Sequence, residues 1–112
     1  MSEHSARFGA QRPVGLSGFY ERVLDRTRQL WTLPFVPGRR LAAGKPVYVL
    51  TSGATFSGGE ALAYDLQQLG RATVVGERTR GGAHPRRGFR VHAHLEATIP
   101  VARAVSPISG SN

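Results

Sequence analysis

The chain has 112 residues, of which 40% are apolar and 20% charged, with no cysteine and a net charge of +8. This length allows at most one domain, whose core would have little margin, and the lack of cysteine excludes disulfides and thiolate metal sites. Its apolar runs are too short to span a bilayer, and its first ten residues lack an apolar signal segment. These features do not determine the cellular compartment.

The positive charge comes almost entirely from arginine, since Lys45 is the one lysine among 15 basic residues. Such a field could attract nucleic acid or an anionic membrane. The arginines are scattered, however, and no aromatic residues alternate with them as a base-stacking surface would require. A compositional bias toward arginine explains the charge better, and we do not expect nucleic acid as the partner.

The first third of the chain gives a mixed signal. Residues 1–16 lack any period and predict a loose end. Residues 17–31 carry apolar side chains at helical spacing behind a serine cap, but their end could equally be extended, because Pro34 disfavours a helical residue before it. Residues 36–46 contain Pro-Gly turn chemistry and predict a loop.

A β-turn-α-β unit follows. Residues 46–50, PVYVL, predict a strand buried on both faces. A helix is expected from Gly59 to Leu69, with Gly70 as its stop. Its expected apolar stripe consists of Leu62, Leu66 and Leu69, flanked by Ala61 and Tyr64. Residues 72–77, ATVVGE, predict a second buried strand, parallel to the first by a right-handed crossover.

The remainder predicts a glycine-rich loop over residues 79–88 and one long strand over residues 89–99, where apolar and polar side chains alternate. Pro100 would end that strand, and the last seven residues are turn formers. Two buried strands, one helix and an amphipathic strand close poorly on their own. We therefore expect an α/β fold that is a fragment of a larger domain.

Ser57, at the strand-to-helix turn, allows three interpretations. With Glu60 it forms the S-x-x-E pattern of a capping box, which needs no catalysis to explain it. A phosphate cradle is disfavoured, because Gly59 and Glu60 stand where a P-loop requires lysine and a hydroxyl. A nucleophile would also suit this position, since free backbone N–H groups at a helix start favour developing negative charge and Gly58 offers one oxyanion donor.

The segment KPVYVLTSGATFSGGEALAYDLQQLGRATVVGERTRGGAHP resembles the tail-specific protease family, the C-terminal processing serine peptidases. It is most similar to the branch of interphotoreceptor retinoid-binding protein, with tricorn protease a more distant cousin. The resemblance implies a partial catalytic domain over residues 17–112, with a crotonase-like α/β core in residues 45–112. It implies Ser57 as the nucleophile in T-[AF]-S-x-x-E, the Gly58 amide as oxyanion donor, and Glu60 as a supporting cap.

The general base departs from the family pattern. Gly81 and Gly82 would line the site, and Gly82 stands where a Ser/Lys dyad has its lysine. The histidine and carboxylate of the tricorn-like arrangement have no counterpart here, and His4 lies in the expected loose end. His84 is a candidate replacement base within the loop, although a solvent-facing loop histidine is the simpler interpretation.

His92 and His94 would lie on one face of the long strand. Two histidines without a third ligand make a weak metal site, and a polar strand face explains them better.

The expected function is therefore a serine-type peptidase that forms an acyl-enzyme on Ser57 and acts on a peptide or protein. We expect no metal or cofactor, and we expect this chain alone to be inactive without the remainder of the peptidase domain. Two alternatives stay open: binding of an apolar ligand without catalysis, as in the retinoid-binding relative, and nucleic-acid binding from the net charge.

Overall fold

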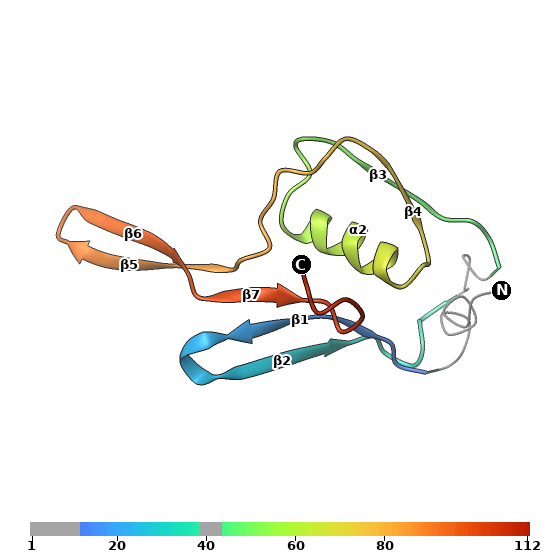
Figure 1. Ribbon diagram of the computed structural model, residues 1–112, viewed down its shortest axis with the longest axis horizontal. Coiled ribbons are helices and arrows are strands. Elements are labelled where there is room, and N and C mark those ends of the chain that lie inside the picture. The colour runs from blue at the N-terminus through green and yellow to red at the C-terminus, as the bar shows by residue number, and fades with distance from the viewer. Residues whose placement is uncertain (1–11, 39–43) are drawn as a thin grey trace.

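Three small sheets and one α-helix make up the part of the chain that the computed structural model describes, residues 12–38 and 44–112 (Figure 1). The strands are β1 (Gly15–Glu21), β2 (Arg26–Trp31), β3 (Tyr48–Thr51), β4 (Thr73–Gly76), β5 (Arg86–His92), β6 (Leu95–Pro100) and β7 (Ala102–Val105), and the helices are the 3-10 turn η1 (Arg22–Leu24) and α2 (Gly58–Gln68). The described part is elongated, 55 × 31 × 28 Å, and none of its helices has the length and apolar character to cross a membrane.

Residues 17–31 lie in a β-hairpin, so the helical interpretation of their spacing is wrong, and the extended alternative, which concerned only their end, is correct there. β1 pairs with β2 and, on its other edge, with β7, both antiparallel. The turn closes through Asp25, which adopts a left-handed φ of 43° and accepts a hydrogen bond from Tyr20 Oη at 2.9 Å. A helix would have placed these two side chains on different faces, whereas the hairpin uses their bond to fix its turn.

The β-turn-α-β unit is confirmed. β3 and β4 are parallel and in register, from Tyr48 opposite Thr73 to Thr51 opposite Gly76, and α2 connects them. The helix ends as expected at Gly70, which takes a φ of 62°, and the N–H of Arg71 reaches back to the carbonyl of Leu66. This is how a glycine past the last turn satisfies carbonyls that the helix leaves free.

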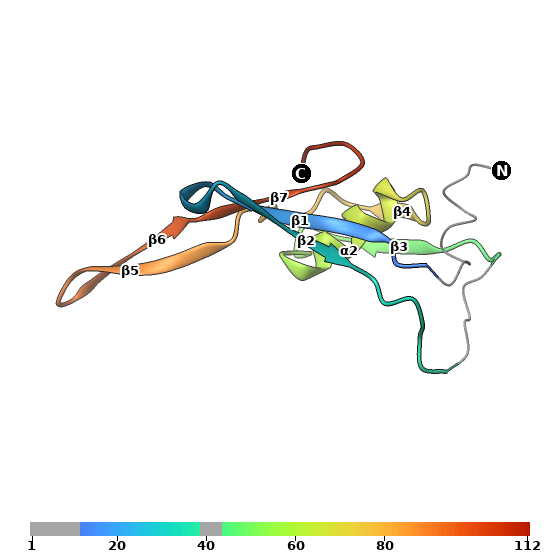
Figure 2. The same ribbon diagram turned by 90° about the horizontal axis from the view of Figure 1, so that it is seen from below.

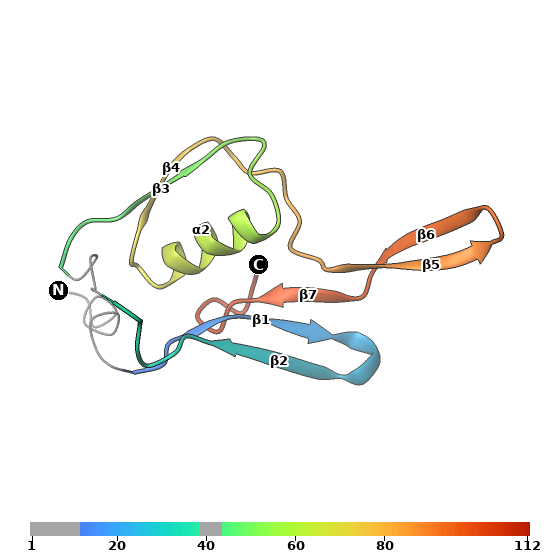
Figure 3. The same cartoon turned by 180° about the vertical axis from the view of Figure 1, so that it is seen from behind.

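α2 lies between the β3–β4 pair and β1, as Figures 1 and 3 show. α2 buries Ala63, at 5% exposure, and Leu69, the residue that follows the helix, is buried as well, at 8%. The expected apolar stripe is therefore wrong in part, because Leu62 is 58% exposed. The side of the helix facing β1 is instead tied by a polar contact, since Asp65 Oδ1 accepts a hydrogen bond from the N–H of Ser17 at 2.9 Å.

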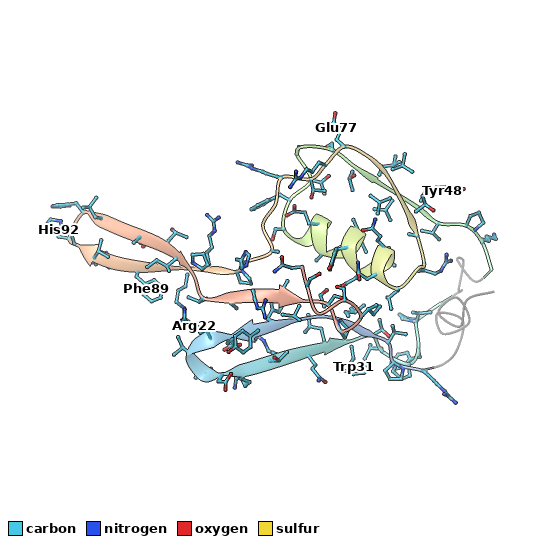
Figure 4. The ribbon with its side chains drawn as sticks, viewed as in Figure 1. Arg22, Trp31, Tyr48, Glu77, Phe89 and His92 are labelled. Carbon is cyan, nitrogen blue, oxygen red and sulfur yellow. The ribbon has the colours of Figure 1, made fainter. Side chains whose placement is uncertain are left out.

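Neither β3 nor β4 is buried on both faces, contrary to the expectation. Their side chains alternate: Val49 and Val74 are half-buried, whereas Tyr48 and Leu50 are 64% and 79% exposed. Figure 4 shows Tyr48 pointing outward from β3. The reason is that α2 covers one face of this two-stranded sheet, and no described element covers the other.

The expected long strand over residues 89–99 is also wrong. Two strands, β5 and β6, pair antiparallel with a turn at Ala93 and His94. This hairpin projects away from the other two sheets (Figures 1 and 2) and its side chains are largely exposed. Alternation continues across a two-residue turn, so the pattern alone did not reveal the reversal.

The expected turn at the C-terminus is present, with the N–H of Gly110 bonded to the carbonyl of Ser106. The expected loose end is described only from residue 12, and its last residues, Gly15 and Leu16, belong to β1. His4 and residues 39–43 of the expected loop lie outside the described residues.

Candidate active site

The turn from β3 into α2, residues 52–57, is organised by its own hydroxyl groups. Ser52 Oγ accepts a hydrogen bond from the N–H of Ala54 at 3.2 Å, and Thr55 Oγ1 accepts one from the N–H of Ser52 at 3.0 Å. The side chain of Thr51, at the end of β3, donates to the carbonyl of Glu77 at 2.8 Å. These three hydroxyls are engaged in holding the backbone, which leaves Ser57 as the hydroxyl that the turn presents.

Ser57 has a backbone conformation that L-residues rarely adopt, with φ 52° and ψ −114°. It is exposed and directly precedes α2. Such a conformation costs of order 1–3 kcal/mol and persists only where the surroundings enforce it. A serine on a sharp strand-to-helix turn also occurs in nucleophile elbows, although Thr55 stands here where the G-x-S-x-G pattern has its first glycine.

Backbone donors surround this serine. The N–H groups of Gly59 and Ala61 are bonded to the carbonyls of Phe56 and Ser57. Within the described residues no group accepts a hydrogen bond from the N–H of Gly58. A free N–H at the first residue of a helix, where the helix dipole is positive, can bind a developing oxyanion.

Glu60 caps the start of α2, as the sequence predicts, and Ser57 and Glu60 form a capping box. Its firm half is the bond from the N–H of Ser57 to Glu60 Oε2, at 2.8 Å. The other half is looser, because Ser57 Oγ faces the N–H of Glu60 without meeting the stricter geometry of a hydrogen bond. The carboxylate thus provides the firmer half of the cap, and the serine oxygen provides the weaker half.

The glycine-rich loop covers residues 77–85, because residues 86–88 of the expected loop belong to β5, and it packs against this turn. The N–H of Arg80 donates to the carbonyl of Thr55 at 3.0 Å, and the Arg80 guanidinium lies 5.4 Å from the ring centre of Phe56. A Cβ at Gly82 would lie 2.5 Å from Cε2 of the same ring. The Phe56 ring occupies the space into which a side chain at position 82 would project, so a larger residue at this position would require the ring to move.

Glu77 is a site residue that the sequence interpretation missed. Its Oε2 accepts a hydrogen bond from the N–H of Gly53 at 2.8 Å, and its N–H donates to the carbonyl of Thr51 at 3.0 Å. It directly follows β4, and Figure 4 shows it at the end of that strand. Because the carboxyl ends of parallel strands meet at one edge, a carboxylate at the end of ATVVGE could have been placed beside the β3 turn.

His84 is exposed, and no hydrogen bond joins it to Ser57 among the described residues. Its neighbour Ala83 accepts a bond from the N–H of Ala104 at 2.8 Å, which ties this part of the loop to β7. The structure thus brings Ser57, Gly58, Glu60 and Gly81 together by direct contacts or neighbouring positions, and it places Gly82 against Phe56. It does not join His84 to them.

His92 is the last residue of β5 and His94 lies in the β5–β6 turn, so the two do not lie along one strand face. Their ring centres are 5.8 Å apart, and the N–H of His94 donates to His92 Nδ1 at 3.3 Å, which occupies that nitrogen. Figure 4 shows His92 at the far end of the hairpin, away from α2. No cluster of three or more metal-ligating side chains is found within residues 12–38 and 44–112.

Comparison with known families decides the ancestry of this arrangement. Residues 10–111 match peptidase family S41. The chain belongs to this family. Because the match covers the β3 turn, α2 and the glycine-rich loop together, the resemblance to the C-terminal processing peptidases is confirmed at the level of the family. Membership in S41 supports a serine-peptidase origin for the chain and peptides or proteins as its substrate class.

Proposed function

We propose that this S41 chain carries the nucleophile of a serine peptidase, Ser57, together with one oxyanion donor, the N–H of Gly58. The observation that carries the proposal is the strained backbone of an exposed serine, φ 52° and ψ −114°, at the junction of a strand and a helix. Strain at one residue in an otherwise regular turn is typical of functional positions. A helix cap alone does not require it, because an N-cap ordinarily has an extended backbone.

The proposed reaction is acyl transfer. Ser57 Oγ forms a bond to the carbonyl carbon of the substrate while its proton passes to a base. The carbonyl oxygen becomes an oxyanion that the N–H of Gly58 stabilises, and loss of such a donor typically costs a hundredfold or more in rate. The C–N bond then breaks, the amine leaves with a proton, and water hydrolyses the acyl-enzyme.

The rate of peptide hydrolysis depends on the general base that accepts the proton of Ser57. A lysine at position 82, as in the Ser/Lys members of the resemblance, would meet the ring of Phe56, and within the described residues Ser57 Oγ has no hydrogen bond to any base. We therefore propose that the chain alone turns over peptides very slowly. Turnover that disappears in Ser57→Ala and also in His84→Ala would overturn this part and identify His84 as the base.

The proposal also includes a crotonase-like core, a branch within the family and a larger domain around the chain. The parallel β3-α2-β4 unit is compatible with a crotonase-like core, and the loop with Gly82 favours the retinoid-binding branch over the Ser/Lys members. The exposed outer side chains of the β3–β4 sheet, Tyr48 and Leu50, support a larger domain in which another layer covers them.

Labelling with a fluorophosphonate tests the nucleophile on the full chain. Peptide mapping by mass spectrometry should find the adduct on Ser57 and not on Ser52 or Ser109, which serve as internal controls. The adduct should vanish in Ser57→Ala and persist in Ser52→Ala. Equal labelling of Ser57 and Ser109 would contradict the proposal, because Ser57 would then be no more reactive than an ordinary surface serine.

Apolar-ligand binding is the second candidate, favoured by the exposed Tyr48 and Leu50. A fatty acid that binds equally to wild type and Ser57→Ala, and weakly to Leu50→Ser, would support it. Nucleic-acid binding has less support, because three arginines lie over aromatic rings of the chain itself and cover faces on which bases would stack. These pairs are Arg28 with Phe19, Arg80 with Phe56, and Arg103 with Tyr20.

A further inference from the structure

We infer that Glu60 is a positioning residue of the site, whose carboxylate fixes the Ser57 backbone and the glycine-rich loop relative to each other. The inference rests on the proposed role of Ser57 as nucleophile and extends it. It assigns to Glu60 more than a helix cap, because a cap requires contacts only to the start of its own helix.

The contacts of the carboxylate carry this inference. Oε2 accepts a hydrogen bond from the N–H of Ser57 at 2.8 Å, and Oε1 accepts a short one from the N–H of Gly81. The side chain of Thr79 also lies close enough to lower the pKa of this carboxyl. One carboxylate therefore joins the residue before α2 to a loop residue about twenty positions further along the chain. In Figures 1 and 3 the glycine-rich loop passes beside the first turn of α2.

The positive φ of Ser57 explains why such an anchor is needed. A strained residue relaxes unless its neighbours hold it, and the N–H of Ser57 is held by Glu60 alone among the described residues. Without that acceptor the N–H could turn to solvent and the serine could leave the strained region. Ser57 would then lose the backbone conformation on which the proposed function rests.

The hydrogen bond between Glu60 and Gly81 also fixes the glycine-rich loop. The N–H groups of Gly81 and Arg80 point to acceptors in the helix start and in the preceding turn, Glu60 and Thr55. This arrangement fixes the position of Gly81 relative to Ser57. Small displacements near reacting atoms can cost about a hundredfold in rate, because catalysis depends on their alignment.

The ionisation of Glu60 agrees with the geometry. Partial burial raises the pKa of its carboxyl, but hydrogen bonds from Thr79, Gly81 and Ser57 outweigh that effect, and the pKa is lowered overall. No neighbouring charge contributes to the shift. The carboxylate is thus in its accepting form at neutral pH, held so by the same three donors.

An NMR titration of the full chain tests the inference without relying on activity. In wild type, the amide shifts of Ser57 and Gly81 should change together from about pH 7 to about pH 3, with one midpoint below about 4.3, the usual value for glutamate. In Glu60→Gln neither should titrate, and amide exchange over residues 79–81 should be at least tenfold faster. Glu96→Gln is the matched control, because Glu96 is an exposed carboxylate on the projecting hairpin, and it should behave as wild type.

Labelling of Ser57 by the fluorophosphonate should be roughly tenfold slower in Glu60→Gln than in wild type or Glu96→Gln. Different midpoints for the two amides, or wild-type exchange rates in Glu60→Gln, would overturn the inference. If Glu60→Gln does not fold, Thr79→Val removes one donor and should raise the shared midpoint of the two amides; an unchanged midpoint would count against the inference. Absence of labelling at Ser57 in wild type would instead refute the proposed function, and the amide titration would still decide the role of Glu60.

Discussion

Replacing Ser57 by glycine should stabilise the chain relative to replacing it by alanine. At most positions the opposite holds, because glycine leaves the unfolded chain with more freedom to lose. At Ser57, however, the φ of 52° disfavours any residue with a Cβ. Alanine keeps this strain and removes the hydroxyl, whereas glycine removes both.

The size of the effect follows from two opposing contributions. Relief of the backbone strain of a residue in a sparsely populated φ/ψ region stabilises the folded chain by about 1–3 kcal/mol. The added conformational freedom of glycine in the unfolded chain lowers the stability by about 0.4–1 kcal/mol. The serine hydroxyl drops out of the comparison because both variants lack it, and the preference for glycine over alanine at an N-cap acts in the same direction as the relief of strain. The balance is a gain of about 1 kcal/mol for glycine over alanine, or about 4–8 °C in Tm for a domain near this size.

Chemical and thermal unfolding of both variants, followed by circular dichroism, measures this difference. Ser52 provides the control, because Ser57 and Asp25 are the residues other than glycine with positive φ in the described part of the chain. At Ser52 glycine should be less stable than alanine. If Ser57→Gly proved no more stable than Ser57→Ala, the strain would be absent, and the proposed function would lose the observation that supports it.

Three further outcomes are expected. Leu69→Ala should lower the free energy of unfolding by about 2–5 kcal/mol, because Leu69 is only 8% exposed. Leu50→Ala should change it by less than about 0.5 kcal/mol, because Leu50 is 79% exposed. Urea unfolding measures both values. Gly82→Ala should cost about 1–3 kcal/mol through contact with the Phe56 ring, and a double-mutant cycle with Phe56→Ala should recover most of it. The stability that the Glu60 carboxylate contributes is complete above the pKa of about 4.3 that the group has in the unfolded chain, and it is lost as the pH falls through the lowered pKa of the folded chain. The difference in unfolding free energy between wild type and Glu60→Gln should therefore become smaller on acidification.

The unit around the site was predictable because its signals are local. Turn residues, a capping pattern and Gly70 mark the ends of α2, and short β-branched runs mark β3 and β4. Each of these signals acts over a few residues, so no long-range information is required. The same holds for Glu60 as a cap, whereas its bond to Gly81 depends on a loop that follows β4 and could not be inferred from spacing.

The errors arise where packing partners decide the structure. Apolar residues at helical spacing over residues 17–31 became a hairpin, because β1 pairs with β7 near the other end of the chain. Strand burial was overestimated for the same reason. A run such as PVYVL indicates a strand suited to two covered faces, but it cannot say whether a second layer is present, and Leu50 remains open in the described structure.

Ser57 shows why a residue pattern could not choose between cap and nucleophile. Both roles need an oxygen at a helix start, and the pattern S-x-x-E is the same for each. The backbone adds information that the pattern lacks: an ordinary cap has an extended conformation, whereas the backbone of Ser57 stays strained while the Glu60 carboxylate holds its N–H. Because every capping box places the glutamate on the N–H of the cap residue, the strain and not the cap supports the proposed role of Ser57, and the cap and the proposed nucleophile are compatible parts of one arrangement.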